Sequence, residues 1–273
     1  MKIPIRPAIA FLLVLVAGYS NVSADTFLGN GVTSGATQGA FNGGVGGGSL
    51  TLTDDGTNIF GSFTKGTVTG ALLNNSLTIY IDSVAGGFAN NSGFKDTGDG
   101  NRKAISGYST TASQSPLTFV SGFLPDYAIS LEPFNNGGGG NFGGLWQLAN
   151  GAANSMPFIK NVNLSPIGNS NAAVYTFSFS VTNIGLTIGA GQSFALFGTF
   201  DSTSGNRSSE AIAGNIMVDP TFSATNSALK GFIPFDQTSF ATYTTEVIPE
   251  PAILSLVGLF GAATFVAARR RKS

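Results

Sequence analysis

Residues Val174–Val181 read VYTFSFSV, and this stretch decides the fold class. Aromatic and hydroxyl side chains alternate along it, so that Tyr175, Phe177 and Phe179 share one side of an extended chain. Successive side chains of a β-strand point to opposite faces of the sheet. The alternation therefore predicts a half-buried antiparallel strand with one face in water.

Further strand signals lie on both sides of this stretch. Leu77–Asp82 is apolar and rich in β-branched residues, which favours a central strand. Leu50 and Leu52 alternate with threonines, and the alternation of Ile184, Leu186 and Ile188 continues that of Val174–Val181. Other short strands are expected within residues 59–64, 117–124, 127–131, 144–148, 158–164 and 194–200.

These short strands, separated by turn signals, predict an all-β chain. We expect one antiparallel β-sandwich or jelly-roll-like domain over residues 49–245, with the 23 phenylalanines filling its core. Residues 25–48 form a Gly-rich segment with an edge strand near Thr26–Leu28. Ser208–Ile212 is expected to form one short helical turn, and residues 215–245 are expected to be irregular.

The residue types that are missing exclude several kinds of chemistry. The chain has no Cys, so no disulfide holds it together, and no His, so Ser-His-Asp and Cys-His catalysis and His-based zinc sites are excluded. Residues 25–248 hold 13 acidic and 7 basic side chains, a net charge of −6. An acidic domain with no basic run argues against nucleic acid as a partner.

The N-terminus has the pattern of a secretory signal peptide over residues 1–24. Lys2 and Arg6 precede an apolar stretch, and small residues precede a cleavage point between Ala24 and Asp25. The sequence therefore predicts export.

The C-terminus combines three physical features in a fixed order. Residues 249–251 read Pro249-Glu250-Pro251, and residues 252–268 carry no ionisable group. A helix of that length would be about 25 Å long, at the short end of what crosses a bilayer. The basic cluster that follows would stay on the cytoplasmic side; it consists of Arg269, Arg270, Arg271 and Lys272.

This tail resembles the PEP-CTERM sorting signal of Gram-negative bacteria. The resemblance covers residues 246–273 and implies a temporary inner-membrane anchor that an exosortase recognises and cleaves near the PEP motif. It further implies export by the secretion machinery to the cell surface or beyond, often in company with exopolysaccharide. An ordinary C-terminal membrane anchor is the alternative. More weakly, three stretches are similar to bacterial secreted surface proteins with bodies like carbohydrate-binding sandwich modules: Leu77–Phe88, Asp126–Ile129 and Gly143–Leu148.

A calcium site is one hypothesis for the acidic turns. Asp96, Asp99 and Asn101 lie two or three residues apart with glycines between them, a pattern that suits a hard cation. Asp54, Asp55 and Asn58 form a second cluster of this kind. Ordinary solvated turns are the alternative, since the same residue types favour β-turns. No other cofactor is expected.

Two further hypotheses concern carbohydrate. Trp146 and Tyr127 are candidates for stacking on a sugar ring, with Tyr80 and Tyr108 as weaker ones, although a lone Trp in a sandwich usually lies in the core. Asp82, Asp126 and Glu132 would have to converge for a carboxylate-pair hydrolase.

The sequence as a whole predicts a non-catalytic protein of the cell surface or extracellular matrix, associated with exopolysaccharide. A carbohydrate-active enzyme that uses a carboxylate pair, or a purely structural surface protein, is the alternative.

Overall fold

A computed structural model describes residues 24–32, 45–110, 114–134, 141–218 and 232–248. All of them belong to one compact unit, residues 22–248. The predicted sorting motif Pro249–Pro251, the apolar run 252–268 and the basic cluster 269–272 lie outside the described residues, as does most of the predicted signal peptide. Within the described ranges, no helix is long and apolar enough to cross a membrane.

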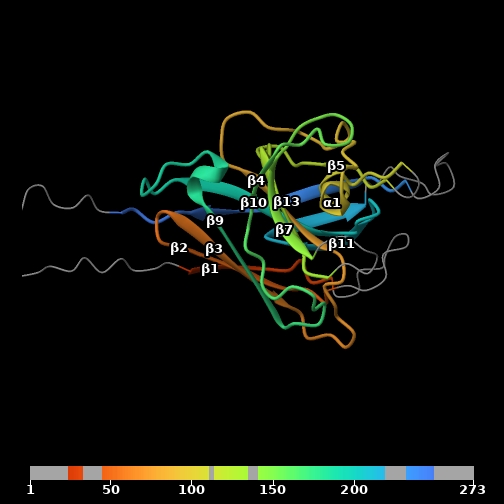
Figure 1. Cartoon of the computed structure of the whole chain (residues 1–273), viewed down its shortest axis with the longest axis horizontal. Helices are drawn as coiled ribbons and strands as arrows, with labels where there is room; N and C mark the ends of the chain where they lie inside the picture. The colour runs from red at the N-terminus through yellow and green to blue at the C-terminus, as the bar shows by residue number, and fades with distance from the viewer. Residues whose placement is uncertain (1–23, 33–44, 111–113, 135–140, 219–231, 249–273) are drawn as a thin grey trace, which may run out of the picture. The chain divides into compact units, whose positions relative to one another are not determined.

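The chain is mostly β-structure, so the all-β prediction is confirmed. A smaller sheet has the strand order β1-β2-β3-β9, and all its pairs are antiparallel (Figure 1). Its strands are β1 (Ala24–Leu28), β2 (Gly48–Asp54), β3 (Asn58–Lys65) and β9 (Val174–Ser180).

The larger sheet has the order β12-β13-β10-β4-β6-β7-β8, with β11 paired to β10 and β5 paired in parallel to β13. β4 (Ser76–Asp82) lies between β10 and β6, which confirms the predicted central strand. The other strands are β5 (Leu117–Thr118), β6 (Tyr127–Glu132), β7 (Phe142–Gln147), β8 (Phe158–Asn161), β10 (Ser193–Asp201), β11 (Arg207–Ile212), β12 (Gly214–Val218) and β13 (Phe235–Thr244).

The two sheets share one apolar core. Tyr175, Phe177 and Phe179 point from β9 into it, as their alternation predicts, and meet Ile79 and Ile129 of the larger sheet. The opposite face of β9 carries Thr and Ser. The smaller sheet is therefore buried on one side and open to water on the other.

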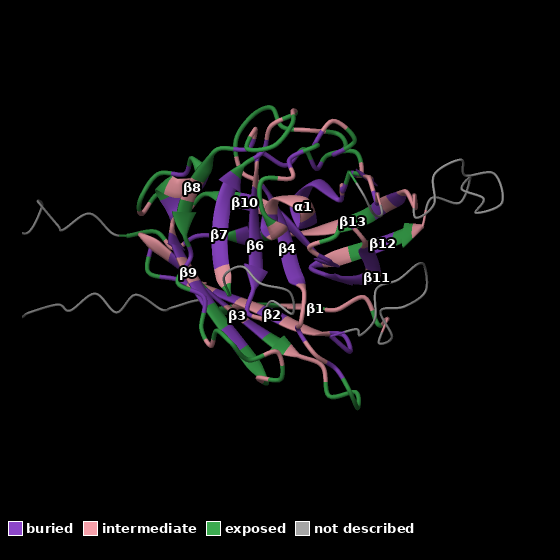
Figure 2. Ribbon diagram, turned by 45° about the vertical axis from the view of Figure 1, so that its right-hand side comes forward, coloured by how far each residue is buried: buried purple, intermediate pink, exposed green. Residues whose placement is uncertain are grey.

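The central strands β4, β6 and β7 of the larger sheet are buried on both faces, which Figure 2 shows as purple along most of each strand. A second apolar cluster covers the face away from the smaller sheet; it includes Tyr80, Phe94, Phe123, Trp146 and Phe197. A short helix, α1 (Gly100–Ser106), packs there against β4 and β6. The molecule thus has a third layer, made of α1 and the loops around it.

Several local predictions were wrong, and this third layer explains two of them. Residues 117–124 were expected to be a strand, but only Leu117–Thr118 pair, while Phe119 and Phe123 pack in a loop over the larger sheet. The body has a helix, α1, where none was expected; Asp99 caps its first turn and Gly107 ends it with φ 57°.

Three other segments also differ from expectation. Ser208–Ile212 lies in β11, because pairing with β10 satisfies its backbone. The region 215–245 contains β12 and β13. The strand pattern does not continue to 184–188: a 3₁₀ turn, η1 (Val181–Ile184), begins with a capping box between Ser180 and Asn183, and residues 185–188 form no strand.

Candidate functional site

The water-facing side of the smaller sheet carries a row of aligned hydroxyl groups. Thr51 lies opposite Thr26 on one side and opposite Ser62 on the other, and Ser62 lies opposite Thr176. Four hydroxyl side chains thus cross the sheet in register, one strand or about 4.8 Å apart. The Oγ1 atoms of Thr26 and Thr51 lie 2.9 Å apart and share a hydrogen bond.

An exposed aromatic ring lies beside this row. Phe60 is 44% exposed, and it lies opposite Thr53 of β2 and Ser178 of β9. Its ring is therefore an apolar patch with a hydroxyl side chain on either side, two residues along the strand from the four-residue row. An aromatic ring held among hydroxyl groups combines an apolar surface with hydrogen-bonding groups, as ligand sites do.

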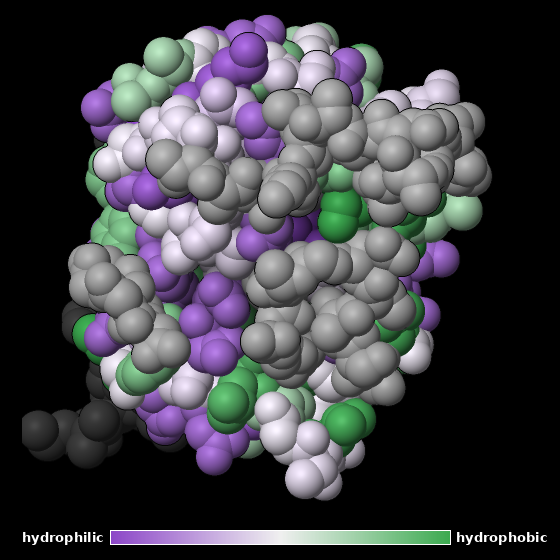
Figure 3. Space-filling model, turned by 90° about the vertical axis from the view of Figure 1, so that its right-hand side faces the viewer, coloured by the Kyte–Doolittle hydropathy of each residue, from purple (hydrophilic) through white to green (hydrophobic). Residues whose placement is uncertain are grey.

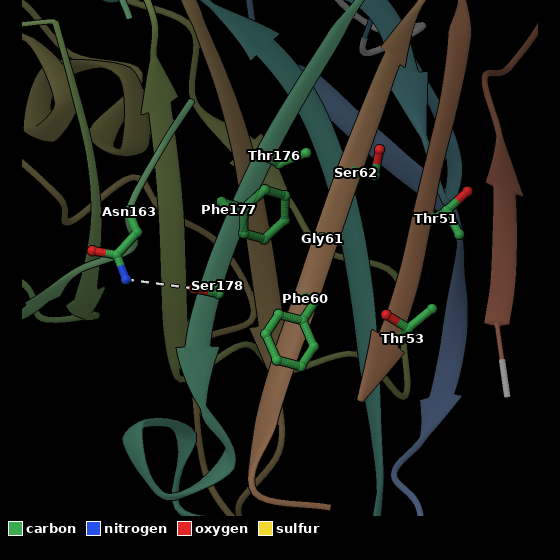
Figure 4. A pocket seen from close by; sticks show the side chains of 9 residues that line it. All are labelled: Thr51, Thr53, Phe60, Gly61, Ser62, Asn163, Thr176, Phe177 and Ser178. Atoms are coloured by element: carbon green, nitrogen blue, oxygen red, sulfur yellow. Dashed lines mark hydrogen bonds between the residues drawn. The ribbon is translucent and has the colours of Figure 1, made fainter. Parts of the chain in front are cut away.

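The hydroxyl row and the set of Thr53, Phe60 and Ser178 border a shallow pocket of about 310 Å³ (Figure 4). Nine residues line it: Thr51, Thr53, Phe60, Gly61, Ser62, Asn163, Thr176, Phe177 and Ser178. None of the nine carries an ionisable side chain. The pocket therefore offers stacking and hydrogen bonds, and its own residues offer no group for proton transfer.

Local backbone geometry places the side chains at the rim. Asn163 adopts φ 53°, a left-handed conformation that Asn tolerates, and its Nδ2 atom lies 3.5 Å from Ser178 Oγ. Gly61 has no side chain, so the Phe177 ring packs against it from the core side. Within the described part of the chain, no protein partner engages the hydroxyls of Thr53 and Ser62, which leaves both available to a ligand.

The residues of the calcium hypothesis do not share a ligand site. Asp96 is completely buried. Its carboxylate accepts hydrogen bonds from the backbone N–H groups of Gly98, Asn154 and Met156 and forms an ion pair with Arg102. Burial alone would raise the pKa of Asp96, but these four donors outweigh it and lower the pKa below its usual value.

The other two predicted calcium ligands have separate roles. Asp99 Oδ1 accepts the Arg102 N–H and Oδ2 the Arg102 Nε–H, while Asn101 Oδ1 accepts from Ser130 Oγ at 2.7 Å. The cation among these residues is thus the guanidinium of Arg102. Over the described ranges, no three carboxylates gather around a metal-sized space. Calcium stays a prediction without a preformed site in this structure.

The second acidic cluster belongs to the β2–β3 turn. Asp54 is buried and accepts the N–H groups of Gly56 and Glu246 and the hydroxyl of Tyr243. Asp55 accepts the N–H groups of Thr57 and Asn58. Both carboxylates therefore stabilise the turn and its neighbours, which is ordinary turn chemistry.

Trp146 lies in the core and is only 1% exposed. Its ring packs against Phe142 and Phe158, with the Arg102 guanidinium 6.0 Å from the ring centroid. In this structure its ring offers no free face to a sugar. Tyr80 is fully buried, whereas Tyr127 and Tyr108 are partly exposed, and stacking on Tyr127 stays a prediction.

The three candidate carboxylates do not converge. Asp126 and Glu132 flank opposite ends of β6, about 20 Å apart at the usual rise per residue. Asp82 and Asp126 lie at the same end of the larger sheet. Burial raises the pKa of Asp126, and the nearby Asp82 adds to the rise, against opposing N–H bonds from Val84 and Ser83. Asp82 accepts the N–H of Leu124. Both carboxylates thus anchor loops.

A separate polar cluster lies buried beneath α1. Arg207 and Asp201 form an ion pair at 3.0 Å with both side chains fully buried, and Arg207 also donates to the hydroxyl of Tyr80. At the C-terminal end of β6, burial raises the pKa of Glu132 to about 8, and the nearby Asp99 adds to the rise. These groups are closed off from solvent, so they contribute to stability and not to a surface site.

Phe60 is the functional candidate that the sequence prediction missed. In the stretch Ile59–Thr64, apolar residues occur in both phases of the alternation, so the pattern alone does not say which ring faces water. The register of the β2–β3 hairpin could have shown that Phe60 faces water. Once the turn at 55–57 is assigned, Phe60 falls opposite Thr53, on the side that the β2 threonines mark as outward.

Comparison of the chain with protein-family models, curated proteins and solved structures gives no match.

Proposed function

We propose that the chain is an exported surface or matrix protein whose body binds neutral polysaccharide through the open face of its smaller sheet. The observation that carries this proposal is the placement of Phe60 between Thr53 and Ser178, beside the hydroxyl row of Thr51, Ser62 and Thr176. A sugar ring has apolar C–H faces and a rim of hydroxyls. An aromatic ring among hydroxyl side chains complements both.

The absence of charge around the pocket limits the type of sugar. All nine lining residues are neutral, and the body carries a net charge of −6. An anionic polysaccharide would be repelled by the body and would find no cation in the pocket. A neutral polymer is the class that this face suits.

Export and sorting form the second half of the proposal. Pro249-Glu250-Pro251, the apolar run 252–268 and the basic cluster 269–272 would anchor the chain in the inner membrane until processing releases the body. The signal peptide would end at Ala24. At the two ends of the described body, Asp25 pairs with Leu52 and the N–H of Glu246 is bonded to Asp54. Asp25 and Glu246 therefore both lie beside the C-terminal half of β2.

A carboxylate-pair hydrolase is the second candidate. Only Asp82 and Asp126 lie near each other, and both accept backbone N–H bonds from loops. A pair held in this way stabilises loop structure, which favours the non-catalytic proposal. A purely structural surface protein is the third candidate, and it differs in predicting no affinity for sugar.

Affinity electrophoresis of the purified protein tests the proposal. The gels would contain dextran, hydroxyethyl cellulose, alginate or the exopolysaccharide of the producing cells. We expect retardation in a neutral polymer or in the native exopolysaccharide, and none in anionic alginate. No retardation in any gel would reject the glycan-binding function. Release of reducing sugar ends that ceases in Asp126→Asn would favour the hydrolase.

A further inference from the structure

The last three described residues, Glu246–Ile248, are fixed to the body by their backbone. The Glu246 N–H donates to Asp54 Oδ1 at 2.8 Å, and the Ile248 N–H donates to the Gly189 carbonyl at 3.1 Å. Between them, Val247 forms an antiparallel bridge with Ala190. We call this segment the strap. In sequence it is followed directly by Pro249, the first residue of the predicted sorting motif.

Three glycines form the seat of the strap. A Cβ atom on Gly56 would lie 2.4 Å from Ile248 Cγ1, one on Gly189 would lie 2.8 Å from Ile248 Cβ, and one on Gly191 would lie 2.5 Å from Val247 Cγ2. All three glycines have positive φ, at 75°, 67° and 61°. We call them the glycine notch. Any side chain at these positions would strain the backbone and push against the strap.

The strap is held mainly by its backbone. Val247 is 61% exposed and Ile248 is 42% exposed, so neither side chain is buried in the core. Segments with few buried apolar contacts open locally at a much lower free energy than global unfolding. The strap therefore has the features of an element that can undock while the rest of the body stays folded.

We propose that the glycine notch is a docking site for the chain's own strap, and that docking limits proteolytic access to the strap, the last described segment before the predicted sorting motif. A protein that binds an extended segment does so through the backbone N–H and C=O groups of that segment. In the docked strap the N–H groups of Glu246 and Ile248 already bind the body. Cleavage then depends on the population of the undocked state. A biological role for undocking in the processing of the chain rests on the proposed sorting function.

The sequence provides a single-site probe of undocking. The chain has four Glu residues, and Glu132 and Glu210 are buried. Glu250 precedes Pro251, a bond that a glutamate-specific endoprotease cleaves poorly. The remaining bond, Glu246–Val247, lies in the strap. Its cleavage removes residues 247–273, which mass spectrometry detects as one mass change.

The experiment compares cleavage rates of the full chain in mild detergent. Gly189→Ala places a methyl group against Ile248, whereas Gly122→Ala has a similar φ of 89° but no heavy atom within 4 Å of the new Cβ. We expect Gly189→Ala to be cut at least about fivefold faster than wild type, the factor that 1 kcal/mol produces, and Gly122→Ala at the wild-type rate. Ile248→Ala, which leaves every glycine unchanged, should also be cut faster.

Two results would overturn the proposal. One is an equal cleavage rate for wild type, Gly189→Ala and Ile248→Ala. The other is acceleration accompanied by cuts after Glu132 and Glu210, which would mean global unfolding instead of undocking. The measurement involves neither polysaccharide nor a sorting enzyme. Its failure would leave the proposed function standing, and failure of sorting in cells would leave the docked strap unaffected.

Discussion

The ring of Phe177 lies across the inner side of Gly61, so closely that a Cβ atom on Gly61 would be 2.1 Å from the Phe177 Cζ atom. The two residues are directly opposed in the β3–β9 register. The missing side chain on β3 lets the aromatic ring from β9 fill the core at this point. The outer neighbours of this pair are Phe60, Ser62, Thr176 and Ser178, so the packing beneath the sheet supports the binding face above it.

Gly61→Ala should therefore destabilise the body. The added methyl group meets a ring that is only 3% exposed, and overpacking of a core typically costs about 1–3 kcal/mol. Ser62→Ala, one residue further on and pointing to water, should change the free energy of unfolding by less than about 0.5 kcal/mol. Urea denaturation of both variants measures the difference. Equal stability of the two would show that the Phe177 ring can move aside freely.

The buried ion pair gives a second prediction. Arg207→Met leaves the Asp201 carboxylate buried without its cation, which should lower the free energy of unfolding by about 3–5 kcal/mol. Asp201→Leu in the same chain removes the stranded charge and should restore most of the loss. A double-mutant cycle by chemical denaturation checks this. A double variant as unstable as Arg207→Met alone would mean that Arg207 acts through its bond to Tyr80 and its packing.

The raised pKa of Glu132 predicts a pH dependence of stability. In the folded protein the pKa of this carboxyl is about 8, whereas in the unfolded chain it is near 4.5. Between these values unfolding releases a proton, so the contribution of Glu132 makes the fold less stable as the pH rises. Glu132→Gln removes this contribution. The stability of Glu132→Gln relative to wild type should therefore rise by on the order of 3 kcal/mol between pH 5 and pH 8.

Thermal unfolding of wild type and Glu132→Gln at several pH values makes this comparison. If the difference in stability between the two proteins stays constant from pH 5 to pH 8, Glu132 is ionised in the folded state and the assignment fails.

The proposed sorting signal makes a prediction about the mature protein. Mass spectrometry of surface-exposed protein from the native host should show that residues 269–273 are missing, with the new C-terminus near Glu250. Glu250→Ala should leave the chain in the inner membrane. Deletion of residues 269–272 is a useful comparison, because it alters the anchor without changing the motif. An intact Arg269–Ser273 on the surface protein would exclude processing.

The main strands of the fold were predictable because their alternation matches their environment. β9 has one wet and one buried face, and β4 is buried on both faces and carries apolar residues on both, Leu77, Ile79 and Ile81 on one and Tyr80 on the other. β11 was not predictable in this way. Its sequence RSSEAI is polar, yet Glu210 is buried and accepts N–H bonds from Val45, Gly46 and Gly47. Those bonds join residues far apart in the chain, which no local pattern reveals.

The candidate site was harder to predict for a related reason. Trp146 was a candidate for stacking on a sugar, with the core as the alternative, and α1 and its loops cover the face on which it lies. Phe60 resembles the buried phenylalanines in sequence and differs from them in facing water. Which side of a strand faces water depends on pairing with its neighbours, so the register of β2, β3 and β9 had to be known first.

In the proposed function, Phe60 and its hydroxyl neighbours bind a neutral polysaccharide. The most direct test measures the dissociation constant from the retarding polymer in affinity gels for wild type, Phe60→Ala and Met217→Ala. Met217 is a matched control, because it is 46% exposed but lies on β12 of the other sheet. We predict that Phe60→Ala weakens binding about tenfold, as the loss of about 1.4 kcal/mol of stacking implies, and that Met217→Ala binds like wild type. Equal binding by all three proteins would show that Phe60 takes no part in polysaccharide binding.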